Sequence, residues 1–261
     1  MTLFDKFLRI RELGIFSIIV VFVIVASIID PRFMTFDSWR AVFLAIPLIL
    51  VMAMGQMMVI ICRHVDISIG SILAFSAIVI GLLFIQIPGL SLWLSLLICA
   101  FVGLIMGLIN GIIVTRFNVH SIIVTLGTLS LYRGLVFIVS GGRQIDRNDI
   151  PEHVVSFSQT SFLFSIPGIL IFSAVIVIVS HLVMRHSVLG REIYATGSNP
   201  VAAHLKGINV TKVTLFCFGV CGMLAGVAGL FYASRFGYVN PGVTGVGIEF
   251  IVIAGVIIGG T

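Results

Sequence analysis

The chain of 261 residues is 59% hydrophobic and only 10% charged, with a formal net charge of +5. Soluble domains are about 45–50% apolar and about 25% charged, so this composition excludes an ordinary soluble protein and indicates an integral membrane protein. The positive charge does not indicate nucleic-acid binding, because the basic residues are scattered between apolar runs, a pattern typical of membrane orientation.

Long apolar runs follow one another along the chain, and residues 67–115 contain no Asp, Glu, Lys or Arg. A spanning helix needs about 20 apolar residues, whereas strands of a β-barrel alternate polar and apolar residues. The runs are continuous, with Pro88 and Gly89 as a turn between two of them. We therefore expect an all-α, polytopic helical membrane protein that forms a single transmembrane domain over residues 1–261. About eight transmembrane segments are expected, at 14–30, 41–61, 67–87, 90–115, 121–140, 163–184, 213–233 and 246–261.

The two ends of the sequence carry different patterns. Lys6, Arg9 and Arg11 precede the first apolar run, and because further spans follow, this run is interpreted as an uncleaved first helix. Residues 250–261 are uncharged, too few to span, and followed by no polar tail. We therefore expect the chain to be truncated at its C-terminus, within a membrane segment of a longer protein.

Basic residues between the runs predict the orientation. If the loops alternate from an inside N-terminus, the inside carries more Lys and Arg than the outside, and the outer loops also carry acids, so the N-terminus is predicted to be cytoplasmic. The inside set is Lys6, Arg9, Arg11, Arg63, Arg116, Arg185, Arg191, Lys206 and Lys212. The outside set is Arg32, Arg40, Arg143, Arg147 and Arg235, with the acids Asp30, Asp37, Asp146, Asp149 and Glu152.

Small residues predict close helix packing. Glycines repeat every four residues in three runs, and such spacing lets helix backbones approach closely in lipid. Packing within one chain is the preferred interpretation, with dimerisation through these glycines as the alternative. The glycines are Gly103, Gly107 and Gly111, then Gly222 and Gly226, then Gly255 and Gly259. The four cysteines match no zinc spacing and are expected to be buried packing residues.

Polar residues at membrane depth are the candidates for a substrate pathway. Asp66 is interpreted either as the N-cap of the third span or as a ligand of a hydroxylated solute. Arg133 is interpreted either as a pathway residue or as a side chain that reaches the interface. Gly127 is expected to loosen its helix. The full set predicted for the pathway is Gln56, Asp66, Ser68, Asn110, Thr125, Thr128 and Arg133.

Motifs of nucleotide hydrolysis and of common hydrolases do not occur in the sequence. There is no Gly-x-x-x-x-Gly-Lys-Ser/Thr, no His-Glu-x-x-His, no Gly-x-Ser-x-Gly and no Cys/His metal spacing. We therefore expect no catalytic residue, no metal and no enzymatic activity in this chain.

A polar loop of about residues 185–212 interrupts the apolar pattern. Within it, residues 200–206 predict a two-turn helix, with Asn199 as N-cap, Pro200 at the first position and Gly207 just after its end. Lys206 suits the negative end of the helix dipole. Such a short helix is marginal alone, so it docks either on its own bundle or on a partner protein.

At these residues the chain resembles the permease subunits of bacterial ABC importers for monosaccharides. The matching stretches are "MGQMMVIICRHVDISIGSILAFSA", "GLINGIIVTRFNVHSIIVTLGTLSLYRG" and "GREIYATGSNPVAAHLKGINV", within a resemblance from about Ser38 to Thr261. Arg63 before the Asp66 motif is most similar to the autoinducer-2 and rhamnose branch. The resemblance implies a multi-pass protein of the bacterial inner membrane that translocates a small sugar or sugar-like signal. The alternative from the residues alone is a self-sufficient secondary transporter or channel for a small neutral solute.

The resemblance also implies partners. Two permeases, identical or paralogous, would form the pore in membrane lipid, with two ATPase subunits inside and a periplasmic or lipid-anchored substrate-binding protein outside. ATP and Mg would be used by the ATPase, with no cofactor bound by this chain and no nucleic acid involved. The predicted short helix would be the element that couples to the ATPase, through Asn199, Pro200, Ala202, Ala203, Leu205 and Gly207.

Overall fold

A computed structural model describes residues 11–159, 161–163 and 166–260 of the chain. Within them, six helices are long and apolar enough to cross a membrane. They are α3 (Phe36–Ile61), α4 (Ile69–Gln86), α5 (Leu92–Phe117), α6 (Ser121–Ser140), α8 (Gly168–His186) and α11 (Val210–Phe236). The first and last predicted runs form shorter apolar helices, Phe16–Ile29 within α2 (Arg11–Ile29) and α12 (Ile248–Ile258). The predicted all-α, polytopic membrane protein is thereby confirmed, while Lys6, Arg9 and Thr261 lie outside the described residues.

The chain divides into two compact units, Met1–Ala45 and Ile46–Thr261. In the first unit, α2 is followed by the short 3-10 helix η1 (Pro31–Met34) and the start of α3. Asp30 caps η1, because its Oδ1 accepts a hydrogen bond from Arg32 N at 2.9 Å. Phe33 packs edge-on against Phe22 and Trp39, with ring centroids 6.4 and 6.0 Å apart. The single domain predicted for residues 1–261 stays a prediction.

In the second unit, α11 is the most buried of the long helices and packs closely against α5. The two backbones meet at glycines: a Cβ added to Gly107 would lie 2.9 Å from Gly222 Cα, and one added to Gly226 would lie 3.0 Å from Gly103 Cα. Any side chain there would force the helices apart, which is why small residues are needed. The predicted packing within one chain is confirmed for these two runs. At Gly255, by contrast, an added Cβ would meet no described atom within 4 Å.

α6 runs unbroken from Ser121 to Ser140, so the helix loosening predicted at Gly127 is wrong. The flanking threonines bond back within the helix: Thr125 Oγ1 donates to Ser121 O at 2.9 Å, and Thr128 Oγ1 donates to Thr125 O at 3.4 Å. Side chains that satisfy backbone carbonyls of their own helix leave its ladder of hydrogen bonds intact.

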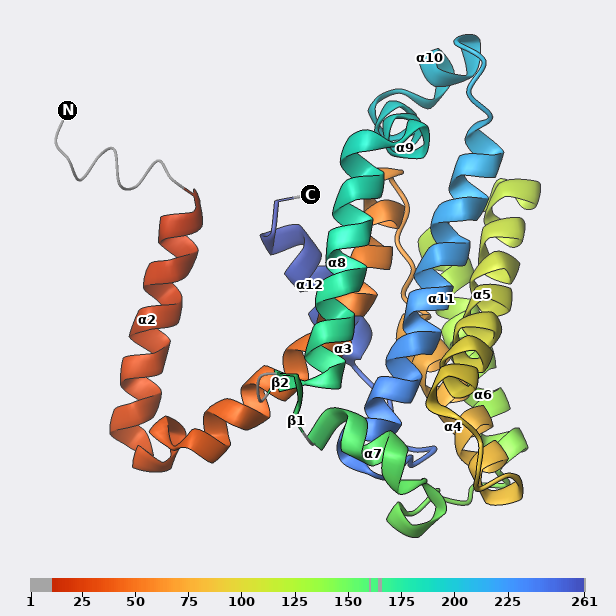
Figure 1. The fold of residues 1–261 in the computed structure, drawn as a ribbon. Helices are drawn as coiled ribbons and strands as arrows, with labels where there is room; N and C mark the ends of the chain where they lie inside the picture. Colours follow the sequence, from red (N-terminus) through yellow and green to blue (C-terminus); the bar gives the residue numbers. More distant parts are fainter. Residues whose placement is uncertain (1–10, 160, 164–165, 261) are drawn as a thin grey trace, which may run out of the picture. The chain divides into compact units, whose positions relative to one another are not determined.

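The remaining elements lie at the two ends of the second unit. Figure 1 shows α9 and α10 at one end and α7 at the other. Two short strands pair antiparallel before α8. The bounds are η2 (Arg147–Asp149), α7 (Glu152–Gln159), β1 (Ser161–Leu163), β2 (Ile166–Pro167), α9 (Val188–Ser198) and α10 (Pro200–Leu205).

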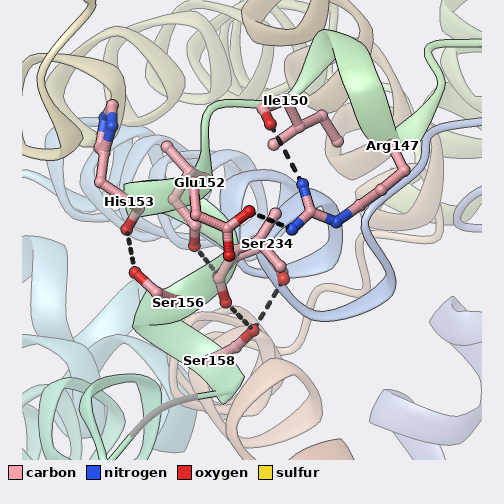
Figure 2. Close-up of polar contacts among 9 residues, drawn as sticks. Arg147, Ile150, Glu152, His153, Ser156, Ser158 and Ser234 are labelled. Atoms are coloured by element: carbon pink, nitrogen blue, oxygen red, sulfur yellow. Dashed lines mark hydrogen bonds and ion pairs between the residues drawn. The ribbon is translucent and has the colours of Figure 1, made fainter.

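Hydroxyl groups fasten α7 to the end of α11. Ser158 Oγ donates to Ser234 O at 2.7 Å, as Figure 2 shows. Ser234 Oγ donates back to Val154 O at 2.5 Å. In the same view, Arg147 pairs with Glu152 at 2.5 Å. Because the serine bonds are buried, they hold α7 more firmly than the exposed ion pair does.

Candidate functional site

The helix α10 forms as the sequence predicts. Asn199 Oδ1 accepts hydrogen bonds from Val201 N and Ala202 N, both at 3.1 Å, and Pro200 takes the first helical position. Gly207 follows the helix end with a φ of +85°, a conformation that glycine adopts without strain. Replacing an N-cap of this type by alanine costs about 1 kcal/mol, so these residues shape the short helix before any partner binds.

Two apolar side chains of α10 face outward, beside the exposed His204. Leu205 is 82% exposed and Val201 is 71% exposed, on a helix with only six residues. Ala203, in contrast, is 3% exposed and belongs to the core of its own chain. Ala203 was predicted as a coupling residue together with its neighbours, but it faces inward, because a two-turn helix at the surface must turn one side to the bundle. Ala202 is half-buried, and Asn199 and Gly207 are exposed.

The helix α9 lies within the predicted polar loop of residues 185–212 and rests on the end of α3. At Gly197 a Cβ would collide with Ile61 O, so only glycine allows this approach. Arg63 Nη2 donates to Ser198 O at 2.5 Å, and the Cys62 thiol lies 3.9 Å from Ile193 O. α9 and the α10 that follows it are therefore tied to the segment between α3 and α4.

That segment, residues 62–68, is here called the connector, and it leads to a buried polar cluster. Asp66 Oδ1 accepts hydrogen bonds from Ser68 N at 2.9 Å and Ser68 Oγ at 2.7 Å. Asn110 Nδ2 of α5 donates to Ser68 Oγ at 2.7 Å and to Asp66 Oδ2 at 3.2 Å. Tyr132 OH of α6 lies 3.2 Å from Asn110 Oδ1. Burial raises the pKa of Asp66, and the hydrogen bonds from Ser68 and Asn110 act in the opposite direction.

Two further predicted residues hold the connector backbone. With its side-chain amide oriented to satisfy both ends, Gln56 donates to Asp66 O at 3.3 Å and accepts from Asp66 N at 3.2 Å. Thr125 Oγ1 donates to Val65 O at 3.3 Å. The cluster of Gln56, Asp66, Ser68, Asn110 and Tyr132 is thus anchored from α3, α5 and α6.

One alternative for Asp66 is wrong. Asp66 is not the N-cap of α4, since the helix begins at Ile69 after Ser68, and the Asp66 carboxylate forms a turn with Ser68 instead. The role predicted for Arg133 stays a prediction; its Nη1 donates to Thr244 O at 2.6 Å. It therefore ties α6 to the loop before α12. Thr128 is buried beside Thr125.

Sequence reasoning missed Glu249 and Tyr132. Glu249, in the first turn of α12, is 6% exposed; its Oε1 accepts from Gly247 N at 3.3 Å and its Oε2 has no hydrogen-bond partner among the described residues. Gly70 of α4 lies against this oxygen and against Gly245 O. Glu249 could have been noticed as a single acid at the start of an otherwise apolar run, whereas nothing in the local sequence distinguished Tyr132.

All four cysteines are buried and free, as predicted. Cys62 and Cys217 have their sulfur atoms 3.6 Å apart and join the connector to α11. His64 lies beside them on the connector, and burial, then the nearby charge of His120, lowers its pKa.

Residues 40–261 match the model of the family described as branched-chain amino acid transport system / permease component. The chain is 34% identical over 234 residues to the autoinducer 2 import system permease protein LsrC of Yersinia enterocolitica, which covers 90% of this chain and 63% of the relative. It is 33% identical over 234 residues to the proteins of the same name from Yersinia pseudotuberculosis and Yersinia pestis, covering 90% of this chain and 65% of each relative. The chain thus spans just under two thirds of the length of these relatives. No solved structure matches. The resemblance expected from the motifs is confirmed.

Proposed function

The chain belongs to the family of permease components of the branched-chain amino acid transport system type, and from this premise we propose that it is the membrane-spanning subunit of an ATP-binding cassette importer. Its cargo is a small sugar or sugar-like signal such as autoinducer 2 or rhamnose. The LsrC relatives carry autoinducer 2 import in their name, which supports this class of cargo.

The observation that carries the proposal is the exposed, pre-shaped helix α10. A water-exposed helix of six residues with two nearly free apolar side chains, Val201 and Leu205, is a surface that a partner covers. Its caps reduce the ordering cost of binding, since the helix exists before docking. We propose that the partner is an ATPase subunit, which binds and hydrolyses ATP with Mg while this chain binds no cofactor.

The charge of the two ends supports an inside location for α10. The ends of the helices near α9 and α10 carry Arg63, Arg116, Arg185, Arg191, Lys206 and Lys212, whereas the end near α7 carries acids that offset its arginines. By the positive-inside rule, α10 then faces the cytoplasm of a bacterial inner membrane, and the N-terminus does as well. The α7 end faces the binding protein, which is periplasmic or lipid-anchored. A second permease, identical or paralogous, completes the pore.

The proposed pathway passes the polar residues predicted from the sequence. Gln56, Asp66, Ser68, Asn110 and Thr125 gather in the second unit, where hydroxyl and amide groups suit a neutral hydroxylated solute. All five are buried and bonded to one another or to the connector, so passage of a solute requires the bundle to open. Thr128 and Arg133 belong to the same proposal at the neighbouring turns of α6.

Reconstitution tests the proposed function. The chain is placed in liposomes with or without the ATPase subunits, the binding protein and MgATP, and uptake of labelled autoinducer 2 is measured. We expect uptake only with all components. Uptake by the chain alone under an ion gradient would instead support a secondary transporter.

A further inference from the structure

Arg63 occupies a backbone position that usually belongs to glycine. At the end of α3, Arg63 N donates to Ile60 O at 2.9 Å and His64 N donates to Val59 O at 3.0 Å, while Arg63 has a φ of +66°. Helices that end in this way place one residue in the left-handed conformation, most often glycine, because a Cβ is unfavourable there. The backbone conformation at this helix end therefore does not favour arginine, so a role for this residue must lie in the contacts of its side chain.

The side chain of Arg63 joins two helix ends. Its guanidinium donates to Ser198 O, the last carbonyl of α9, at 2.5 Å. Beside this bond, the backbone of Gly197 rests against Ile61 O at the end of α3. The carbonyls that end a helix carry partial negative charge, so two such ends repel unless a cation is present. Arg63 supplies that cation and stabilises the contact.

The contact between the ends of α3 and α9 connects α10 on one side with the buried polar cluster on the other. Asn199, which follows Ser198, is the N-cap of α10. In the other direction Asp66 lies three residues after Arg63, with its backbone held by Gln56 and its carboxylate bonded to Ser68. These contacts form a continuous route from α10 through Arg63 to Asp66 and the start of α4.

We propose that Arg63 is a positioning residue that transmits movement of α9 and α10 to the connector and to the buried polar cluster. This inference rests on the proposed function, because an ATPase must supply the movement. Without the guanidinium, α10 still docks and ATP is still hydrolysed, but α9 slides on the end of α3 and the cluster stays closed.

Arg63→Gly is the decisive variant, because glycine suits the left-handed backbone and removes only the side chain. The chain is assembled with its ATPase and binding protein in liposomes, and uptake of labelled autoinducer 2 and release of phosphate are measured together. We expect uptake per ATP hydrolysed to fall about tenfold, the loss expected for one hydrogen bond to a charged group. Assembly should be kept and the thermal midpoint should change little, because the lost hydrogen bond and the relief of the left-handed backbone strain offset each other. Arg63→Lys should retain part of the coupling, and Arg116→Ala, at the exposed end of α5, should leave it unchanged.

The outcomes separate the two proposals. If the wild-type assembly shows no ATP-dependent uptake, the proposed function fails. If the wild type transports and Arg63→Gly keeps the same uptake per ATP, the role of Arg63 is wrong and the proposed function stands. If both Arg63→Gly and Arg63→Lys fail to assemble, Arg63 is a folding residue and the inference is also overturned.

Discussion

Removing the side chain of Leu205 should weaken binding of the ATPase without harming the fold. Leu205→Ala deletes three carbons, worth about 0.8 kcal/mol each when buried. Since Leu205 is 82% exposed in the free chain, nearly all of this area is available to a partner. The loss is therefore about 2 kcal/mol of binding free energy, or about 30-fold in Kd. Exposed substitutions change the free energy of unfolding by only about 0.5 kcal/mol or less.

The affinity is measured by titrating the ATPase subunit onto the detergent-solubilised chain, and the thermal midpoint is measured in parallel. Ile138→Ala is the matched control, because Ile138 is an equally apolar residue, 75% exposed, on α6. It should leave the Kd unchanged. If Leu205→Ala binds the ATPase as tightly as the wild type, α10 is not the docking surface. If it unfolds at a much lower temperature, the exposed face of α10 is a packing face in the protein.

Four further changes follow from the same contacts. Ala203→Asp places a charge in the core under α10, so it should lower the thermal midpoint of the chain even without the ATPase; an unchanged midpoint would contradict the buried placement. Gly222→Val overpacks the contact of α11 with α5 and should lower the unfolding free energy by about 2 kcal/mol in denaturant titration; no change would argue against backbone contact there. Burial lowers the pKa of His64, so stability should fall as the pH drops below about 6.5, and His64→Gln should flatten this slope in a thermal series. Asp66→Asn and Asn110→Asp should each lower the stability of the chain, and the double variant, which restores an amide–carboxylate pair, should regain stability but not uptake. If the double variant also regains uptake, the cluster has only a structural role.

Features that depend on local chemistry could be predicted from the sequence. The apolar runs determine the helices because lipid leaves no other way to satisfy the backbone. The caps of α10 act within two or three residues, so Asn199 and Gly207 were found without knowledge of the fold. The glycines of α5 and α11 were also found, since their spacing fixes one helix face, although their pairing with each other is a tertiary fact.

Features that depend on which face meets which neighbour could not be predicted in the same way. Ala203 and Leu205 both looked like contact residues, yet two positions along a helix point about 200° apart, and only the bundle decides which one is covered. Asp66 was interpreted as an N-cap or as a ligand, and its bond from Asn110, which lies on another helix, could not be read from the local pattern. Arg133 has its acceptor at Thr244, more than a hundred residues away.

The start of α4 is the point where the two ends of the second unit meet. From the α10 end, the connector delivers Asp66 and Ser68 to the residue before the helix. From the α7 end, Val239 pairs with Ile145, and the loop that follows brings Gly245 against Gly70 in the first turn of α4. Glu249 Oε2 lies against the same glycine. In the proposed importer, an ATPase acting at one end and a binding protein acting at the other would both act on this same buried turn.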